Sequence, residues 1–231
     1  MSLMIGVPTY NGQLHHATVG GMLQTAHFCA KAGIGFTVEI VPHDAFIGKA
    51  RATICERFLK SEFNDLLFVD ADIGFTVKDV IQICRADVDV AMGLYRLKIE
   101  GADEGKQMKF PALMHDPIKR HEKDPFLIGL QYGPAGFLKI RRPVLEKMIE
   151  KYPEEYWNGD DGKTHDFFPC GRHEHYFFGE DIGFCTRLGQ MGIDLWGVQN
   201  LSLDHYGEKK WPSKWRIDIP PEEANGTHVP V

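Results

Sequence analysis

Residues 66–72 read Leu-Leu-Phe-Val-Asp-Ala-Asp, four apolar residues followed directly by two aspartates that stand two positions apart. A short apolar run with polar residues after it is typical of a strand buried on both faces of a parallel sheet. Open α/β sheets bind their ligands beyond the carboxyl ends of the strands. Asp70 and Asp72 are therefore the first candidates for ligand binding.

The segments on either side alternate in the same way between apolar strands and amphipathic helices. We predict strands over residues 3–7, 36–41, 66–69 and 88–92. We predict helices over residues 15–31 and 77–84. A further helix is predicted where Ala50, Ile54 and Phe58 recur at every fourth position. This βαβαβαβ order predicts an α/β fold with a Rossmann-like, mostly parallel sheet covered by helices on both faces.

The second half of the chain is less regular. Residues 99–123 are predicted to be loop or β-ribbon, and Pro143 is suited to the first turn of a helix. Residues 152–175 are rich in Gly, Pro, Asp and aromatic residues and predict a long ordered or mobile loop. A helix over about 181–191 and a closing strand over 193–196 complete the expected elements.

Composition excludes several classes of function. The chain has 231 residues, of which 43% are hydrophobic and 25% charged, as in folded soluble proteins, so we expect one domain. A net charge of −6 without a Lys/Arg block argues against nucleic acid or an anionic membrane as partner. No apolar run approaches the roughly 20 residues of a transmembrane helix, and we expect a cytoplasmic protein.

Cysteine usage favours reduced thiols. Five scattered cysteines are an odd number without a C-x-x-C pair. Cys170 with His173-Glu174-His175 offers ligands too few and too adjacent for a structural zinc site.

The two aspartates have two possible roles from their residue type alone. Carboxylates that share one end of a strand suit Mg²⁺ or Mn²⁺, which keep coordination positions for phosphate oxygens. The alternative is that one of them closes a turn or caps the helix that begins near Thr76. The position after a buried strand favours the metal.

Several short motifs along the chain together resemble glycosyltransferases of the GT-A fold, close to family two. They are Val7-Pro8-Thr9-Tyr10-Asn11, Arg51, Phe68-Val69-Asp70-Ala71-Asp72, Gly136-Phe137-Leu138, Gly179-Glu180-Asp181 and His205. The resemblance runs in order from about Met4 to Gly207. It implies a nucleotide-sugar-binding half over about 1–98, an acceptor and catalytic half over about 99–207, and a C-terminal tail over 208–231.

The resemblance also implies a donor site. The implied nucleotide-sugar-binding residues are Pro8, Thr9, Tyr10, Asp44, Arg51, Asp70 and Gly136, with Tyr10 stacking on the base and Gly136 allowing close approach to the sugar. A surface arginine explains Arg51 nearly as well, and a plain turn explains Gly136. The implied metal ligands are Asp70, Asp72 and His205, with Mn²⁺ or Mg²⁺ as the cofactor; taken alone, His205 reads more simply as a hydrogen-bonded core histidine.

Glu180 and Asp181 are the implied catalytic residues. In an inverting enzyme of this type Asp181 is the general base for the acceptor hydroxyl, and Glu180 binds or orients the acceptor. The structural alternative is that either residue stabilises the start of a helix. The loop before them is expected to order over the donor as a lid, and its aromatic residues are candidates for sugar stacking as well as for the core.

The sequence thus predicts a metal-dependent glycosyltransferase with a UDP- or GDP-sugar donor and a glycan, lipid-linked or small-molecule acceptor. The sequence is compatible with a homo-oligomer and with a monomer. Two other functions compete with it. A sugar-phosphate nucleotidyltransferase usually carries a glycine-rich phosphate loop where this chain has Pro8-Thr9-Tyr10-Asn11, and a non-catalytic carbohydrate-binding protein would not need the acidic set.

Overall fold

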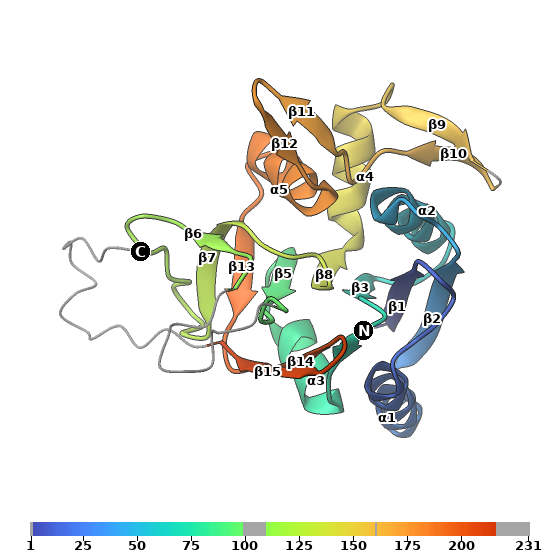
Figure 1. Ribbon diagram of the computed structural model, residues 1–231, viewed down its shortest axis with the longest axis vertical. Helices are drawn as coiled ribbons and strands as arrows, with labels where there is room; N and C mark the ends of the chain where they lie inside the picture. The colour runs from blue at the N-terminus through green and yellow to red at the C-terminus, as the bar shows by residue number, and fades with distance from the viewer. Residues whose placement is uncertain (1, 99–109, 160, 216–231) are drawn as a thin grey trace.

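The computed structural model describes residues 2–98, 110–159 and 161–215. A sheet of eight strands lies at its centre, in the order β2-β1-β3-β8-β5-β13-β7-β6 (Figure 1). In chain order these strands are β1 (Ser2–Thr9), β2 (Gly35–Pro42), β3 (Asp65–Val69), β5 (Val90–Gly93), β6 (Leu113–Met114), β7 (Leu127–Tyr132), β8 (Phe137–Arg141) and β13 (Leu195–Val198).

The direction of the strands confirms the predicted, mostly parallel α/β sheet, in which two strands, β8 and β7, run against the others. β1 pairs in parallel with β2 and β3, and β13 pairs in parallel with β5. β8 lies between β3 and β5 and runs antiparallel to both. A strand from the second half of the chain therefore separates β3 from β5.

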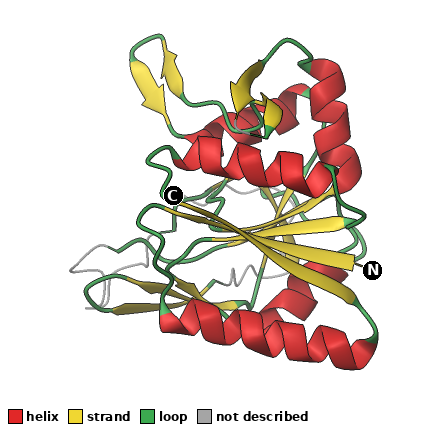
Figure 2. Ribbon diagram, turned by 90° about the vertical axis from the view of Figure 1, so that its right-hand side faces the viewer, coloured by secondary structure: helices red, strands yellow, loops and turns green. Residues whose placement is uncertain are grey.

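Helices cover both faces of this sheet (Figure 2). On one face Leu67 and Val69 of β3 belong to the core that includes residues of α1 (His16–Ala32) and α3 (Val77–Arg85). On the other face Leu66 and Phe68 belong to the core shared with α2 (Ile47–Leu59), α4 (Arg142–Lys151) and α5 (Glu180–Gln190). The prediction that residues 66–69 are buried on both faces is confirmed.

The close packing of α2 on β1 depends on Gly6. A Cβ atom added at Gly6 would lie 2.6 Å from Cγ2 of Ile54. The absence of a side chain at this position lets the helix approach the strand, as glycine does where two backbones come close. This contact sets the position of Arg51, one turn before Ile54 on the same helix.

The segment predicted as a long loop folds into two hairpins. The first pairs β9 (Tyr156–Gly159) with β10 (Gly162–His165), and the second pairs β11 (Gly171–His173) with β12 (Tyr176–Phe178). Phe167 and Phe168, between the hairpins, are buried in the core. The loop prediction was wrong about regular structure because these strands are short and do not alternate in polarity.

A small second sheet contains two strands that follow the predicted closing strand and one that follows β3. It has the order β15-β14-β4, with β4 (Ile73–Gly74), β14 (Ser202–Tyr206) and β15 (Lys210–Lys214). β15 therefore lies in the segment expected to be a tail, and part of the loop predicted over 99–123 lies outside the described residues. Within the described residues, no helix has the length and apolar character that crossing a bilayer requires.

Candidate functional site

A cleft of about 610 Å³ lies at the carboxyl ends of β1 and β3. Its size is within the range of about 300–1,000 Å³ that is usual for small-molecule sites. It brings together the predicted donor segment Pro8-Thr9-Tyr10 and the predicted pair Asp70 and Asp72. The complete lining is Pro8, Thr9, Tyr10, Asn11, Gln13, Leu14, His15, Ile47, Asp70, Ala71, Asp72, Lys98, Tyr206 and Gly207.

The wall after β1 is held by its own hydrogen bonds. The hydroxyl of Thr9 donates to the carbonyl of Gln13 at 3.0 Å, and the side chain of Thr9 is buried. Tyr10 is 73% exposed, so its ring is available to a flat ligand. Tyr10 rather than Thr9 therefore offers the free contact surface on this wall.

The turn after β3 is fixed from both sides. The carbonyl of Ala71 accepts from the backbone N–H of His15 at 2.8 Å, and the backbone N–H of Asp70 donates to the carbonyl of Gly136 at 2.9 Å. β4 begins directly after this turn and pairs with β14, in a register that sets His205 opposite Ile73. The tertiary fold thereby brings His205 next to Asp72.

His205 is held in an orientation that suits a metal ligand. Its Nδ1 lies 2.8 Å from the carbonyl of Arg96, and because a carbonyl oxygen only accepts, Nδ1 carries the hydrogen. Burial lowers the pKa of His205 below its ordinary value, which favours the neutral ring. Nε2 is then an acceptor, and it lies 3.7 Å from Oδ1 of Asp72. Two acceptor atoms that face each other in this way suit a cation between them.

Lys98 supplies a positive charge at the same carboxylate. Its Nζ lies 2.5 Å from Oδ2 of Asp72, the oxygen that does not face His205. The side chains of Lys98 and Asp72 are 32% and 41% exposed, so the pair lies open to the cleft. No group of three His, Cys, Asp or Glu side chains among the described residues is arranged to hold a metal ion.

Arg51 joins the two acidic segments of the site, Asp70–Asp72 after β3 and Glu180–Asp181 at the start of α5. Its side chain is 2% exposed, and its guanidinium donates to Oδ1 of Asp70 at 2.6 Å and to Oε1 of Glu180. Burial by itself lowers the pKa of Arg51, but the two carboxylates outweigh this effect and the pKa is raised above its usual value. Arg51 is therefore a buried link between the turn after β3 and the start of α5, and not the surface arginine that was the alternative.

Glu180 and Asp181 differ in their surroundings. Glu180 is committed to Arg51, whereas Asp181 forms no ion pair with the described residues. Oδ1 of Asp181 accepts from the backbone N–H of Ile182 at 2.8 Å, a contact expected of a residue in the first turn of a helix. Its second oxygen has no hydrogen bond within the part of the chain that the structure describes.

Three of the predicted donor residues lie outside the cleft lining, namely the buried Arg51, Asp44 and Gly136. Asp44 pairs with Lys49 at 3.2 Å and accepts from the backbone N–H of Phe46 at 3.0 Å, as a turn residue does. A Cβ atom at Gly136 would lie 2.5 Å from Oδ2 of Asp70 and 2.3 Å from the hydroxyl of Tyr95. Gly136 thus allows a close approach of the chain to Asp70 itself.

Sequence reasoning missed four residues at the site. His15 and Tyr206 stack with ring centroids 3.8 Å apart, and both line the cleft. Tyr95 packs edge-on against His205 with ring centroids 4.9 Å apart, and Lys98 pairs with Asp72. Tyr95 and Lys98 follow the strand β5, so the rule of strand ends could have found them. Nothing in the sequence signals that His15 and Tyr206 meet.

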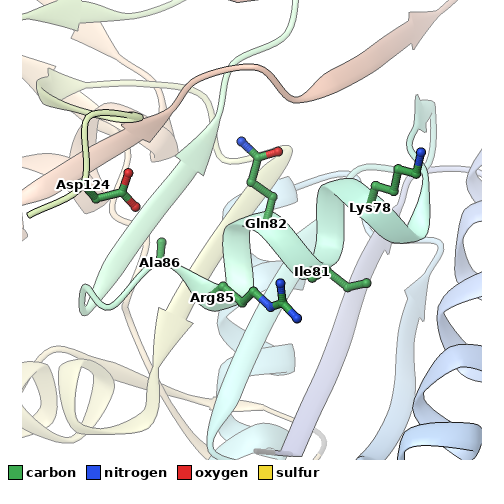
Figure 3. A pocket seen from close by; sticks show the side chains of 6 residues that line it. All are labelled: Lys78, Ile81, Gln82, Arg85, Ala86 and Asp124. Atoms are coloured by element: carbon green, nitrogen blue, oxygen red, sulfur yellow. The ribbon is translucent and has the colours of Figure 1, made fainter.

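A second hollow, of about 380 Å³, lies along α3 (Figure 3). Lys78, Gln82 and Arg85 of the helix line it, and Asp124 faces them from another segment. None of the predicted site residues contributes to it.

Solved structures of several glycosyltransferases are similar to this chain. One is a glycosyltransferase involved in the glycosylation of the major capsid of PBCV-1, with 12% identity and a TM-score of 0.35 over 67% of this chain and 68% of that chain. A mutant of the Drosophila β-1,4-galactosyltransferase 7, in complex with manganese, UDP-Gal and xylobiose, has 12% identity and a TM-score of 0.47 over 100% of this chain and 82% of that chain. S. aureus TarS (1-349) has 14% identity and a TM-score of 0.41 over 86% of this chain and 58% of that chain.

No protein-family model matches the sequence, and no curated protein matches it.

Proposed function

We propose that this protein is a metal-dependent glycosyltransferase, which moves a sugar from a nucleoside diphosphate sugar to an acceptor hydroxyl with inversion. One observation carries the proposal. Pro8, Tyr10, Asp70 and Asp72 line one cleft at the carboxyl ends of β1 and β3, and Arg51 ties Asp70 to the helix that begins with Glu180 and Asp181. A ligand in this cleft would lie beside the acidic pair, which Arg51 connects to the start of α5.

Asp72 and His205 are the residues that would hold Mn²⁺ or Mg²⁺, with Asp70 beside them. The facing acceptors Oδ1 of Asp72 and Nε2 of His205 fit such an ion, and the Arg96 carbonyl orients the imidazole as carbonyls do behind metal-bound histidines. The ion would neutralise negative charge on the departing diphosphate. Each carboxylate has one paired oxygen, Oδ1 of Asp70 with Arg51 and Oδ2 of Asp72 with Lys98, and Asp72 is the more exposed of the two, at 41% against 22%.

Asp181 is the proposed general base. It would accept the proton of the acceptor hydroxyl while that oxygen attacks the anomeric carbon and the bond to the diphosphate breaks. Glu180 is bound by Arg51, so Asp181 is the carboxylate of the two that is available for a proton. Glu180 and Arg51 would position the start of α5, and with it Asp181, relative to Asp70.

The hairpin of β11 and β12 is the proposed acceptor platform. Tyr176 and Phe177 are 78% and 77% exposed, and the hairpin ends directly before α5. Exposed aromatic rings shortly before the proposed base in the chain suit a sugar acceptor, because their flat apolar faces stack on sugar rings. The other hairpin is pinned to α2, where Glu56 bonds His165 and Arg57 bonds Asp161. The β11–β12 hairpin is therefore the proposed lid.

The base assignment is tested with two variants of one residue. Asp181→Asn keeps the ability to stabilise a helix start but accepts no proton at neutral pH, whereas Asp181→Ala loses both properties. We expect Asp181→Asn to fold and to bind donor and Mn²⁺ normally, with a transfer rate lower by on the order of a hundredfold. Transfer is measured with Mn²⁺ and a panel of nucleotide sugars, together with donor hydrolysis. An Asp181→Asn variant that keeps most of its activity, beside an Asp181→Ala variant that melts earlier, would show that Asp181 only stabilises the first turn of α5.

A further inference from the structure

The cation next to Asp72 in this structure is a lysine. Lys98 follows β5, reaches into the cleft and lies with its ammonium 2.5 Å from Oδ2 of Asp72. The aliphatic stem of Lys98 packs closely against Gly207, where an added Cβ atom would lie 3.1 Å from Cδ of Lys98. Since the stem packs against the chain after β14, the ammonium is directed at the acidic turn.

Lys98 and a metal ion would compete for the same charge. Asp72 offers its two oxygens to two different groups, Oδ2 to Lys98 and Oδ1 toward Nε2 of His205. An ion that binds Asp72 and His205 would bring a second positive charge close to the ammonium. Two positive charges beside the same carboxylate repel each other, and this repulsion would weaken binding of the ion.

A diphosphate would reverse this repulsion. Phosphate oxygens in the cleft would bring negative charge that both the ion and Lys98 can contact. Lysine is a common phosphate ligand because its ammonium has three donors and a flexible stem. Lys98 could then leave Asp72 for the phosphate without losing a partner of opposite charge.

We propose that Lys98 is a donor-site residue with two opposite effects: it opposes binding of the metal ion alone, and it binds the diphosphate when metal and nucleotide are present together. The inference rests on the proposed function. It makes Lys98 a contact for the leaving group that no sequence motif indicated, and it predicts that metal and nucleotide bind cooperatively.

The test measures binding and needs no acceptor. Mn²⁺ alone is titrated by electron paramagnetic resonance, and UDP and GDP are titrated by calorimetry with Mn²⁺ present. Lys98→Met keeps the stem and removes the charge, whereas Lys98→Arg keeps a charge. Lys119→Met is the matched control, because Lys119 and Asp194 form a pair at 2.6 Å with similar exposure, outside the cleft.

For Lys98→Met we expect Mn²⁺ alone to bind about two- to fivefold more tightly, as for loss of one partly exposed charge contact. The nucleotide that binds the wild-type protein should bind roughly tenfold or more weakly, as for loss of a charged hydrogen bond. Lys98→Arg should recover part of the nucleotide affinity, and Lys119→Met should change neither value.

Unchanged affinities in Lys98→Met, or a change of both in the same direction, would overturn the inference and leave the proposed function intact. If the wild-type protein binds neither UDP nor GDP in the presence of Mn²⁺, the proposed function fails and this inference fails with it.

Discussion

Removal of the Arg51 charge tests the buried link between the two acidic segments. Arg51→Met keeps most of the stem but leaves Asp70 and Glu180 without the guanidinium that they share. Removing one partner of a buried ion pair typically costs about 3–5 kcal/mol of unfolding free energy. The side chains of Asp70 and Glu180 keep 22% and 19% of their surface exposed, so water would recover part of this loss. We expect a cost of about 2–3 kcal/mol.

The assay is thermal unfolding at pH 7, followed by calorimetry. In a chain of this size each kcal/mol moves Tm by roughly 2–4 °C, so Arg51→Met should melt about 4–12 °C below the wild-type protein. The control is Arg57→Met on the same helix. Arg57 is 38% exposed and pairs with Glu39 and Asp161 at the surface, and its loss should cost less than about 1 kcal/mol.

A double variant separates charge from packing. Arg51→Met combined with Glu180→Gln leaves only one carboxylate at the former link, so it should be more stable than Arg51→Met alone. Equal melting temperatures for Arg51→Met and Arg57→Met would refute the role of Arg51 as a buried link. A double variant less stable than the single one would show that lost packing dominates.

Two further predictions concern the ligands. Asp72→Ala should abolish the difference in UDP or GDP affinity measured by calorimetry with Mn²⁺ and with a chelator, because it removes the carboxylate between Lys98 and His205; equal affinities already in the wild-type protein would contradict a metal at this site. Replacing Tyr176 and Phe177 together by serine should shift Tm by no more than about 2 °C, because both side chains are exposed, and should raise KM for the acceptor while donor binding stays unchanged. An unaltered acceptor KM would exclude the hairpin as the acceptor platform.

Local patterns were sufficient to predict most of the sheet and its helices. The apolar run at 66–69 is long enough for a buried strand and too short for a helix, and residues 3–7 repeat this pattern. Once the strands were assigned, the aspartates at 70 and 72 had to lie at the carboxyl edge of the sheet. The cleft lining confirms that the segments after the first and third predicted strands meet there.

The order of the strands was decided only by the tertiary structure. β8 enters between β3 and β5 from about 70 residues further along the chain than Asp65–Val69, and pairing over such separations leaves no periodic signal in either segment. The two hairpins of residues 156–178 escaped prediction for a related reason, since strands of three or four residues are too short to establish a period.

The sequence likewise predicted some residues of the site, whereas their contacts were decided only by the tertiary structure. Residue type and position after a strand were enough to select Asp70 and Asp72, but the partners of these carboxylates come from α2, from the segment after β5, and from β14. Among these partners, Arg51 and His205 were indicated only by the family resemblance, and Lys98 by no motif. Their chemistry arises from burial, opposite charge and a fixed hydrogen bond, and these depend on contacts that only the folded chain brings together.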